Sequence, residues 1–341
     1  MKSYPSGKLP INDLMQYIGI APVNHERLIV GPGMGLDAAA LDYGDRCLLV
    51  ASDPVTFTTS EAGRYAVQVN ANDIAVMGGR PLWFSAILLF PLDEAVPDEV
   101  KQIFTDMAEA CRELGVVLCG GHTEITHSVN IPVISGTMLG EVKKDSLVTA
   151  GGAKPGDAVI MTKGAGIEGT AILARDFRKR LEGSVNDDIL ERASDFLKKP
   201  GIDVVKDASL VMNVIMPSAM HDATEGGFST ALRELASASE VGLNIYLDQV
   251  IIPEETRILC ETLEVDPMGL ISSGSLIVTC SPEDVEKVLT ALIKEGIKAS
   301  KIGEVRPLEE GLILINKRGE TTLPTFERDE LARLYENVQQ G

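Results

Sequence analysis

The chain has 341 residues, of which 45% are hydrophobic and 24% charged, a composition typical of a soluble globular protein long enough for two cores. Its 31 basic and 50 acidic side chains give a formal charge of −19, which argues against nucleic acid or an anionic membrane as the main partner. No apolar run approaches the roughly 20 residues that span a bilayer, and the N-terminus shows no apolar signal segment. The five cysteines include no Cys-x-x-Cys pair, a pattern typical of reduced, mostly buried thiols, so we expect a cytoplasmic protein.

The first half of the chain alternates between strand and helix patterns. Apolar runs predict strands at 46–52, 83–90, 116–120 and 131–140, of which 83–90 is expected to be buried. Apolar residues at helical spacing predict helices at about 60–77 and from Pro97 to about Leu114.

A turn rich in glycine and proline, at the start of 151–163, leads into a new strand and predicts a domain boundary. We therefore expect an N-terminal domain over residues 1–150 and a C-terminal domain over residues 151–341. The second half repeats the alternation of strand and helix. Its predicted elements are a polar helical segment at 181–205, a strand at 272–280, a helix at about 282–296, a strand at 297–305 and a terminal helix within 327–341.

The helix at 60–77 raises a chemical question. It is apolar on nearly every side and should be buried, yet its middle carries Asn70, Asn72 and Asp73. A buried carboxylate without a partner costs several kcal/mol. We therefore expect a compensating group opposite Asp73.

Two more aspartates lie at the ends of apolar segments, Asp37 in GPGMGLDAAAL and Asp53 in VASDPV. Together with Asp73 they form a set of oxygen ligands of the kind that Mg²⁺ prefers, and Mg²⁺ usually also binds phosphates. Gly33 and Gly35 would let backbone N–H groups approach a phosphate closely.

Each aspartate also has an ordinary structural interpretation. Asp37 could cap a helix that begins at 38–40, Asp53 could form a turn before a proline, and the polar groups of Asn72 and Asp73 could bind neighbouring backbone. The glycines of GPGMGL do not make a dinucleotide-binding fingerprint, because Leu36 replaces the last glycine.

Two further segments join polar residues to glycines. GGHTEIT (120–126) follows the predicted strand and offers Gly120, Gly121, Thr123 and Glu124, besides a histidine. HDATEGGF (221–228) brings the end of a strand to the start of a helix, a ready anion site. The alternative for the second segment is an ordinary strand-to-helix turn.

In order, the segments DAAAL, SDPV, NDIAVMGGRP, GGHTEIT, HDATEGGF, SSGSLIV and IGEV resemble the AIR synthase superfamily, and NDIAVMG with DAT-x-GG is similar to its HypE group. The resemblance implies an α+β protein with two AIR-synthase-like domains. Their expected forms are an N-terminal ferredoxin-like α/β domain, whose sheet pairs with that of a second copy into a dimer barrel, and a C-terminal α/β sandwich domain. Members activate an oxygen or another heteroatom by ATP-dependent phosphorylation, with ATP in a cleft walled by both domains.

The resemblance also implies roles for individual residues. The expected Mg²⁺ ligands are Asp37, Asp53 and Asp73. The expected ATP-binding residues are Gly33, Gly35, Asn72, Gly120, Gly121, Thr123, Gly226 and Gly227. On the reaction side of the cleft we expect Asp222, Thr224 and Glu124.

The sequence departs from the HypE pattern in three places. HypE acts on a cysteine at its own C-terminus, whereas this sequence ends in ENVQQG, so we expect a small molecule or a separate carrier protein as substrate. Glu225 stands where HypE-like chains tend to have arginine, and His122 where relatives often have an acid. Two alternatives therefore stay open: a nucleotide-binding scaffold of a maturation complex that has lost its chemistry, and a small-molecule kinase.

Overall fold

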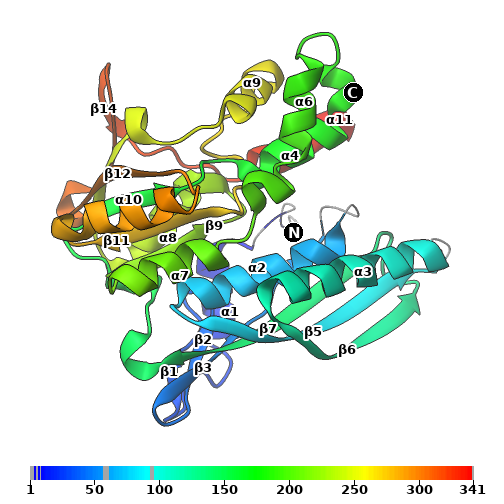
Figure 1. The fold of residues 1–341 in the computed structure, drawn as a ribbon, viewed down its shortest axis with the longest axis horizontal. Coiled ribbons are helices and arrows are strands. Elements are labelled where there is room, and N and C mark those ends of the chain that lie inside the picture. Colours follow the sequence, from blue (N-terminus) through cyan, green and yellow to red (C-terminus); the bar gives the residue numbers. More distant parts are fainter. Residues whose placement is uncertain (1–3, 5–6, 8, 57–60, 93–95, 340–341) are drawn as a thin grey trace. The chain divides into compact units, whose positions relative to one another are not determined.

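The structure, a computed structural model, describes residues 4, 7, 9–56, 61–92 and 96–339 (Figure 1). It divides into two compact units. The first, called here the N-terminal unit, contains residues 24–32 and 37–147; the second, the C-terminal unit, contains residues 1–23, 33–36 and 148–341. Each unit is built on a mixed sheet flanked by helices, which confirms the α+β class.

The sheet of the N-terminal unit carries its described strands in the order β1-β2-β3-β7-β5-β6, with β4 paired to β7. The strands are β1 (Leu28–Val30), β2 (Ala39–Asp42), β3 (Arg46–Ala51), β4 (Pro54–Val55), β5 (Arg80–Pro91), β6 (Val117–Thr126) and β7 (Val133–Lys143). The pair β5–β6 is parallel and the others are antiparallel. Helices α2 (Ala62–Val76) and α3 (Pro97–Leu114) pack against each other over one face of this sheet (Figure 1).

Helix α2 is buried as the sequence predicts. Every residue from Asn70 to Met77 is buried, because the helix lies between the sheet and α3. At the crossing with α3, Gly63 has no side chain, and a Cβ there would collide with the carbonyl oxygen of Ile103. A glycine therefore allows the two helices to pack closely.

Two strand predictions for this unit were wrong in detail. Strand β5 is buried on only one face, and its other face exposes Trp83 and Ile87, because α2 and α3 cover a single side of the sheet. Strand β6 does not end before GGHTEIT but continues through it to Thr126. Glycine weakens a strand, but the parallel ladder with β5 holds Gly120 and Gly121 within it.

The sheet of the C-terminal unit carries its described strands in the order β14-β13-β10-β12-β8-β11-β9. The strands are β8 (Ala158–Thr162), β9 (Ala219–Ala223), β10 (Gly242–Tyr246), β11 (Ser275–Cys280), β12 (Ala299–Arg306), β13 (Leu312–Asn316) and β14 (Gly319–Thr322). The pair β10–β13 is parallel and the others are antiparallel. Strands β8, β9 and β11 are buried along their whole length.

The helices of this unit include those predicted at 181–205, 282–296 and near the C-terminus. They are α1 (Ile11–Ile18), α4 (Ile167–Asp176), α5 (Arg178–Leu181), α6 (Asp187–Ser194), α7 (Val205–Val214), α8 (Gly227–Ser239), α9 (Glu254–Leu263), α10 (Val285–Lys294) and α11 (Glu330–Gln339). One hydrophobic cluster joins α8 to the sheet through Phe228, Leu232 and Leu235. Another joins α4, α6, α9 and α11 and includes the fully buried Leu173 and Leu259.

The cysteines carry free thiols. Four of them are buried, as expected, and burial raises the pKa of Cys260 to about 12, whereas Cys119 is exposed on β6. Among the described helices, none combines the length and the apolar character that crossing a membrane requires.

Candidate functional site

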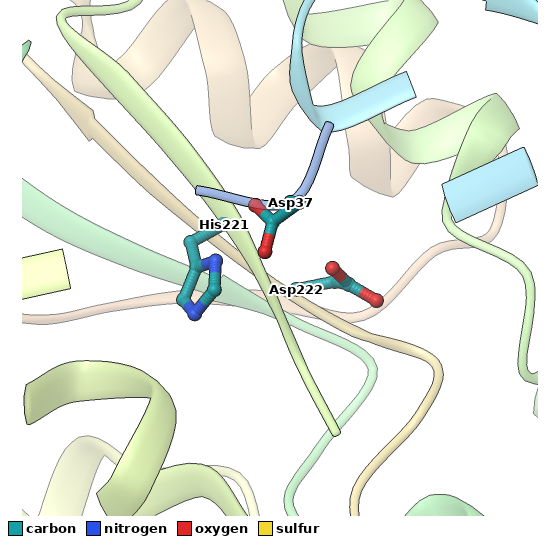
Figure 2. A group of neighbouring side chains, drawn as sticks. All are labelled: Asp37, His221 and Asp222. Atoms are coloured by element: carbon teal, nitrogen blue, oxygen red, sulfur yellow. The ribbon is translucent and has the colours of Figure 1, made fainter. Parts of the chain in front are cut away.

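Strand β9 places two titratable side chains inside the C-terminal unit. His221 and Asp222 are adjacent on β9 and both are buried, and a ring nitrogen of His221 lies within 4.8 Å of a carboxylate oxygen of Asp222 (Figure 2). The Nε2 atom of His221 lies 3.1 Å from Oε2 of Glu234 on α8. This pair ties the strand to the helix that follows it.

The turn from β9 to α8 holds the other predicted residues of HDATEGGF. The carbonyl of Thr224 accepts hydrogen bonds from the N–H groups of Gly227 (3.1 Å) and Ser272 (3.2 Å). Gly226 and Gly227 adopt positive φ angles of 86° and 73°, a conformation that favours glycine. At Gly227 a Cβ would also lie 2.6 Å from the carbonyl oxygen of Met268. The turn itself therefore requires both glycines.

A residue that the sequence reasoning missed closes this turn. Asp329, just before α11, accepts a hydrogen bond from the N–H of Gly226 through Oδ2 and one from the N–H of Leu331 through Oδ1, both 2.8 Å long. Burial raises the pKa of its carboxyl group to about 6, and the nearby charge of Glu225 acts in the same direction. A side-chain carboxylate thus already occupies an anion-binding position at the start of α8.

Glu168 is a second acid that the sequence reasoning passed over. It lies in the first turn of α4, and burial raises its pKa to about 7, with smaller contributions from the charges of Asp329 and Glu225. Ser273 donates a hydrogen bond to it, which opposes the shift. Glu168 belongs to the segment KGAGIEGTA (163–171), whose glycines are typical of a strand-to-helix turn, so this acid could have been found from the sequence.

The segment SSGS connects the turns before α4 and α8. Ser272 Oγ accepts the N–H of Gly166 at 2.7 Å and lies 3.2 Å from Ser275 Oγ, which donates to the carbonyl of Gly164. Since Ser272 also donates its own N–H to Thr224, the two glycine turns are held in one hydrogen-bonded arrangement.

In the N-terminal unit, Asn70 fixes the backbone of Asp53. Its Oδ1 accepts the N–H of Asp53 at 2.8 Å, and its Nδ2 donates to the carbonyls of Asp53 (3.1 Å) and Ala66 (2.8 Å). Residues three apart on a helix share a face, so Asn70 holds Asp53 beside the face of α2 that carries Asp73. Asp73 is only 6% exposed and Asn72 is fully buried, which confirms the burial that the sequence predicted.

Asp37 lies two residues before β2, in a segment without regular secondary structure (Figure 2). Residues 39–42 form a strand, so the alternative in which Asp37 caps a helix is wrong. The preceding segment, Gly33–Leu36, belongs to the C-terminal unit and packs on α8. At Gly35, where φ is +67°, a Cβ would lie 2.9 Å from the carbonyl oxygen of Glu234, so this close approach depends on glycine.

The residues predicted in GGHTEIT lie along the exposed strand β6. Gly120, Gly121 and Thr123 line a shallow pocket of about 230 Å³ between β5, β6 and α3. Glu124 points to the same side of the strand as His122, whose Nε2 lies 3.7 Å from Oε2 of the glutamate. The predicted residues of this segment are therefore accessible within their unit.

Comparisons with known proteins identify the family. The N-terminal domain model of AIR synthase related proteins matches residues 35–142, and the C-terminal domain model matches residues 154–314. Carbamoyl dehydratase HypE of Cupriavidus necator is 31% identical over 319 residues, which cover 89% of this chain and 85% of the relative. The chain belongs to the AIR synthase-related family. The resemblance seen in the sequence is thereby confirmed.

Solved structures of this family agree with the fold. A crystal structure of hydrogenase maturation protein HypE in complex with ATP is 26% identical, with a TM-score of 0.71 over 87% of this chain and 90% of that one. A crystal structure of a HypE–HypF complex gives a TM-score of 0.74 at 23% identity, over 92% of this chain and 99% of that one, which shows the shared fold.

Proposed function

We propose that this member of the AIR synthase-related family is a Mg²⁺-dependent, ATP-using enzyme that activates a heteroatom of its substrate by phosphorylation. A related HypE structure contains ATP, and a relative bears the name carbamoyl dehydratase. The observation that carries the proposal is the buried carboxylate of Asp73, on the face of α2 beside which Asn70 holds Asp53.

The acidic residues fit the metal that the family implies. Carboxylate oxygens are preferred Mg²⁺ ligands, and Asn70 binds the backbone of Asp53 rather than its carboxylate. We propose that Asp37, Asp53 and Asp73 hold the ion, with Asn72 as a supporting group. Bound Mg²⁺ would neutralise charge on the ATP phosphates while a substrate oxygen attacks the γ-phosphorus and ADP leaves.

The glycine segments would bind the nucleotide, and three polar residues would face the reaction. Gly33, Gly35, Gly120, Gly121 and Thr123 offer backbone or hydroxyl groups to ATP in this proposal. Asp222, Thr224 and Glu124 would orient the acceptor substrate. Use of the Gly226 and Gly227 amides by a phosphate would require Asp329 to leave, because its carboxylate accepts the Gly226 N–H.

We also propose a homodimer that pairs the sheets of two N-terminal units. Strand β6 ends the described sheet, and it exposes the side chains of Val117 (60%) and Ile125 (56%). An exposed, apolar edge strand is a template for pairing with another chain. The outer face of β5, with Trp83 and Ile87, would become part of the shared barrel.

We propose that the protein acts in the cytoplasm. The free thiols support a reducing cytoplasm. Because a HypE–HypF complex exists among related structures, a maturation protein is a reasonable class of partner to test.

The experiment is a titration of the protein with Mg²⁺–ATP, followed by a measurement of ATP turnover. Asp73→Asn should weaken Mg²⁺–ATP binding by about 10- to 100-fold, since it removes the charge that would hold the ion. Asp45→Asn, at an exposed position of the same unit, is the control and should bind like the wild type. Unchanged affinity in Asp73→Asn would contradict the metal assignment. Tight binding without turnover, with candidate partners present, would favour a scaffold over an enzyme.

A further inference from the structure

The C-terminal unit contains a pocket of about 580 Å³ that the proposed function does not use. Its lining includes Lys163, Phe196, Lys199, Pro253, Ile297 and Lys298, and none of the residues assigned above to ATP or Mg²⁺. The walls come from the end of β8, the segment after α6, the start of α9 and the segment before β12. Its volume lies within the range of small-molecule sites, roughly 300 to 1,000 Å³.

Beside this pocket, the backbone at the end of β8 lies close to the start of α9. Gly164 adopts a φ of +150°, and a Cβ there would lie 2.9 Å from Pro253 Cδ, so glycine allows the start of α9 to reach β8. Lys163 has a φ of +55°, which is uncommon for a residue with a long side chain. Its N–H donates to the carbonyl of Lys298 at 2.7 Å. Such a conformation persists only where the surroundings hold it.

Two of the cations in the pocket wall are neutralised within the protein. Lys163 is buried, with its Nζ 3.4 Å from Oδ1 of Asp207, and it also donates to the carbonyl of Asp203. Arg192 donates to Glu255 at 2.6 Å and lies 3.9 Å from Glu254. These pairs therefore leave little charge for a ligand.

Two other cations remain available. Lys199 and Lys298 are exposed, and neither is in an ion pair within 4.0 Å among the residues that the structure describes, although the charge of Lys298 acts on Glu255 in the same wall. The lining also contains Asp195, besides the two glutamates that contact Arg192. The first turn of α9 also borders the pocket and carries Glu254 and Glu255, so the four cations of the lining face three acids. In a chain with a formal charge of −19, this is a local site that attracts anions.

The rest of the wall is apolar. Phe196, Pro200, Pro253 and Ile297 present hydrocarbon surface beside the two lysines. A bare inorganic anion would pair with the lysines but leave this surface in contact with water. A ligand with an apolar body would bury it, at about 25 cal/mol per Å².

We propose that this pocket is a second ligand site, which binds a small organic anion with a carboxylate or phosphate group and an apolar body. The anionic group lies between Lys199 and Lys298 near the start of α9, and the apolar body lies against Phe196 and Ile297. The site does not depend on the proposed ATP chemistry.

Phenyl phosphate is the probe, and isothermal titration of the full chain is the measurement. The wild type should bind it, and the double variant Lys199→Gln/Lys298→Gln should bind it at least about tenfold more weakly, because two charge-assisted contacts are lost. The control, Lys179→Gln/Lys294→Gln, removes the same charge from exposed lysines outside the lining and should stay within twofold of the wild type. Thermal unfolding of all three proteins checks that they are folded.

Further titrations separate this site from other sources of binding. Inorganic phosphate, which lacks the apolar body, should bind at least tenfold more weakly than phenyl phosphate, and Ile297→Ser should reduce that difference. Saturating Mg²⁺–ATP should leave phenyl phosphate binding unchanged. The proposal is overturned if the wild type does not bind phenyl phosphate, if ATP displaces it, or if the two double variants bind it equally. The first and third of these outcomes would leave the ATP proposal intact.

Discussion

Asp329 accepts a 2.8 Å hydrogen bond from the N–H of Gly226, although the two residues are 103 positions apart in the sequence. The contact brings the segment before α11 onto the first turn of α8, where helix geometry favours a negative charge. Neighbouring bonds hold the same segment, since Ser229 and Arg233 both donate to the carbonyl of Pro324. The carboxylate therefore takes the position that a phosphate of a ligand would need.

Replacing Asp329 by alanine should change stability and ligand binding in opposite directions. The variant loses the acceptor for the N–H groups of Gly226 and Leu331, so the free energy of unfolding should fall by about 1–2 kcal/mol. If ATP uses the start of α8, its affinity should rise severalfold because no carboxylate competes. Denaturant unfolding and ATP titration measure the two effects. An affinity equal to that of the wild type would show that ATP does not use the Gly226 amide.

Asn70 should matter more for stability than an exposed asparagine. Asn70→Ala removes three hydrogen bonds and leaves the N–H of Asp53 without its acceptor, while the carbonyl of Asp53 keeps the hydrogen bond from the N–H of Gly136. We expect the free energy of unfolding to fall by about 2–3 kcal/mol, measured by denaturant unfolding. Mg²⁺–ATP affinity should fall as well, because Asp53 would no longer be held beside α2.

A control for Asn70→Ala is Gln102→Ala, at an exposed position on α3 of the same unit. It removes one surface contact to Asp106 and should change the free energy of unfolding by less than about 0.5 kcal/mol. A similar effect of the two substitutions would show that Asn70 is an ordinary polar residue.

The sequence predicted elements whose signals are local. Helix α2 was found because its residues are apolar and its end carries glycines and a proline, and its burial made Asp73 conspicuous. Strand β6 was cut short because its two glycines are typical of a turn, whereas the ladder with β5 continues the strand past them. The hydrogen bond between Gly226 and Asp329 could not be predicted, because the residues are 103 positions apart and neither segment carries a sequence pattern that indicates the other. Nor could the pocket beside Lys163, which depends on the packing of four separate segments.

The edge strand β6 provides a direct test of the dimer. Ile125→Lys places a charge on the proposed pairing edge and should convert the protein to a monomer, measured by light scattering after gel filtration. Ile29→Lys is the matched control, since Ile29 is an exposed apolar residue on β1, at the other end of the strand order. It should leave the mass unchanged. A dimer in both variants, or a wild type that is already monomeric, would rule out this interface.

The acid Glu168 should make the protein more stable as the pH falls from 8 to 6. Its folded pKa, about 7, lies above its ordinary value of 4.5, so its contribution to stability is fully present below pH 4.5 and is lost as the pH rises through 7. Between pH 8 and pH 6 the wild type should therefore gain roughly 1 kcal/mol from this group. The side chain in Glu168→Gln stays neutral throughout, so the gain in its free energy of unfolding over the same interval should be smaller by roughly 1 kcal/mol. Effects of the other titrating groups are common to the two proteins and cancel in this comparison. The measurement is the free energy of unfolding in denaturant at pH 8, 7 and 6, and identical pH dependence of the two proteins would contradict the assignment of the raised pKa to Glu168.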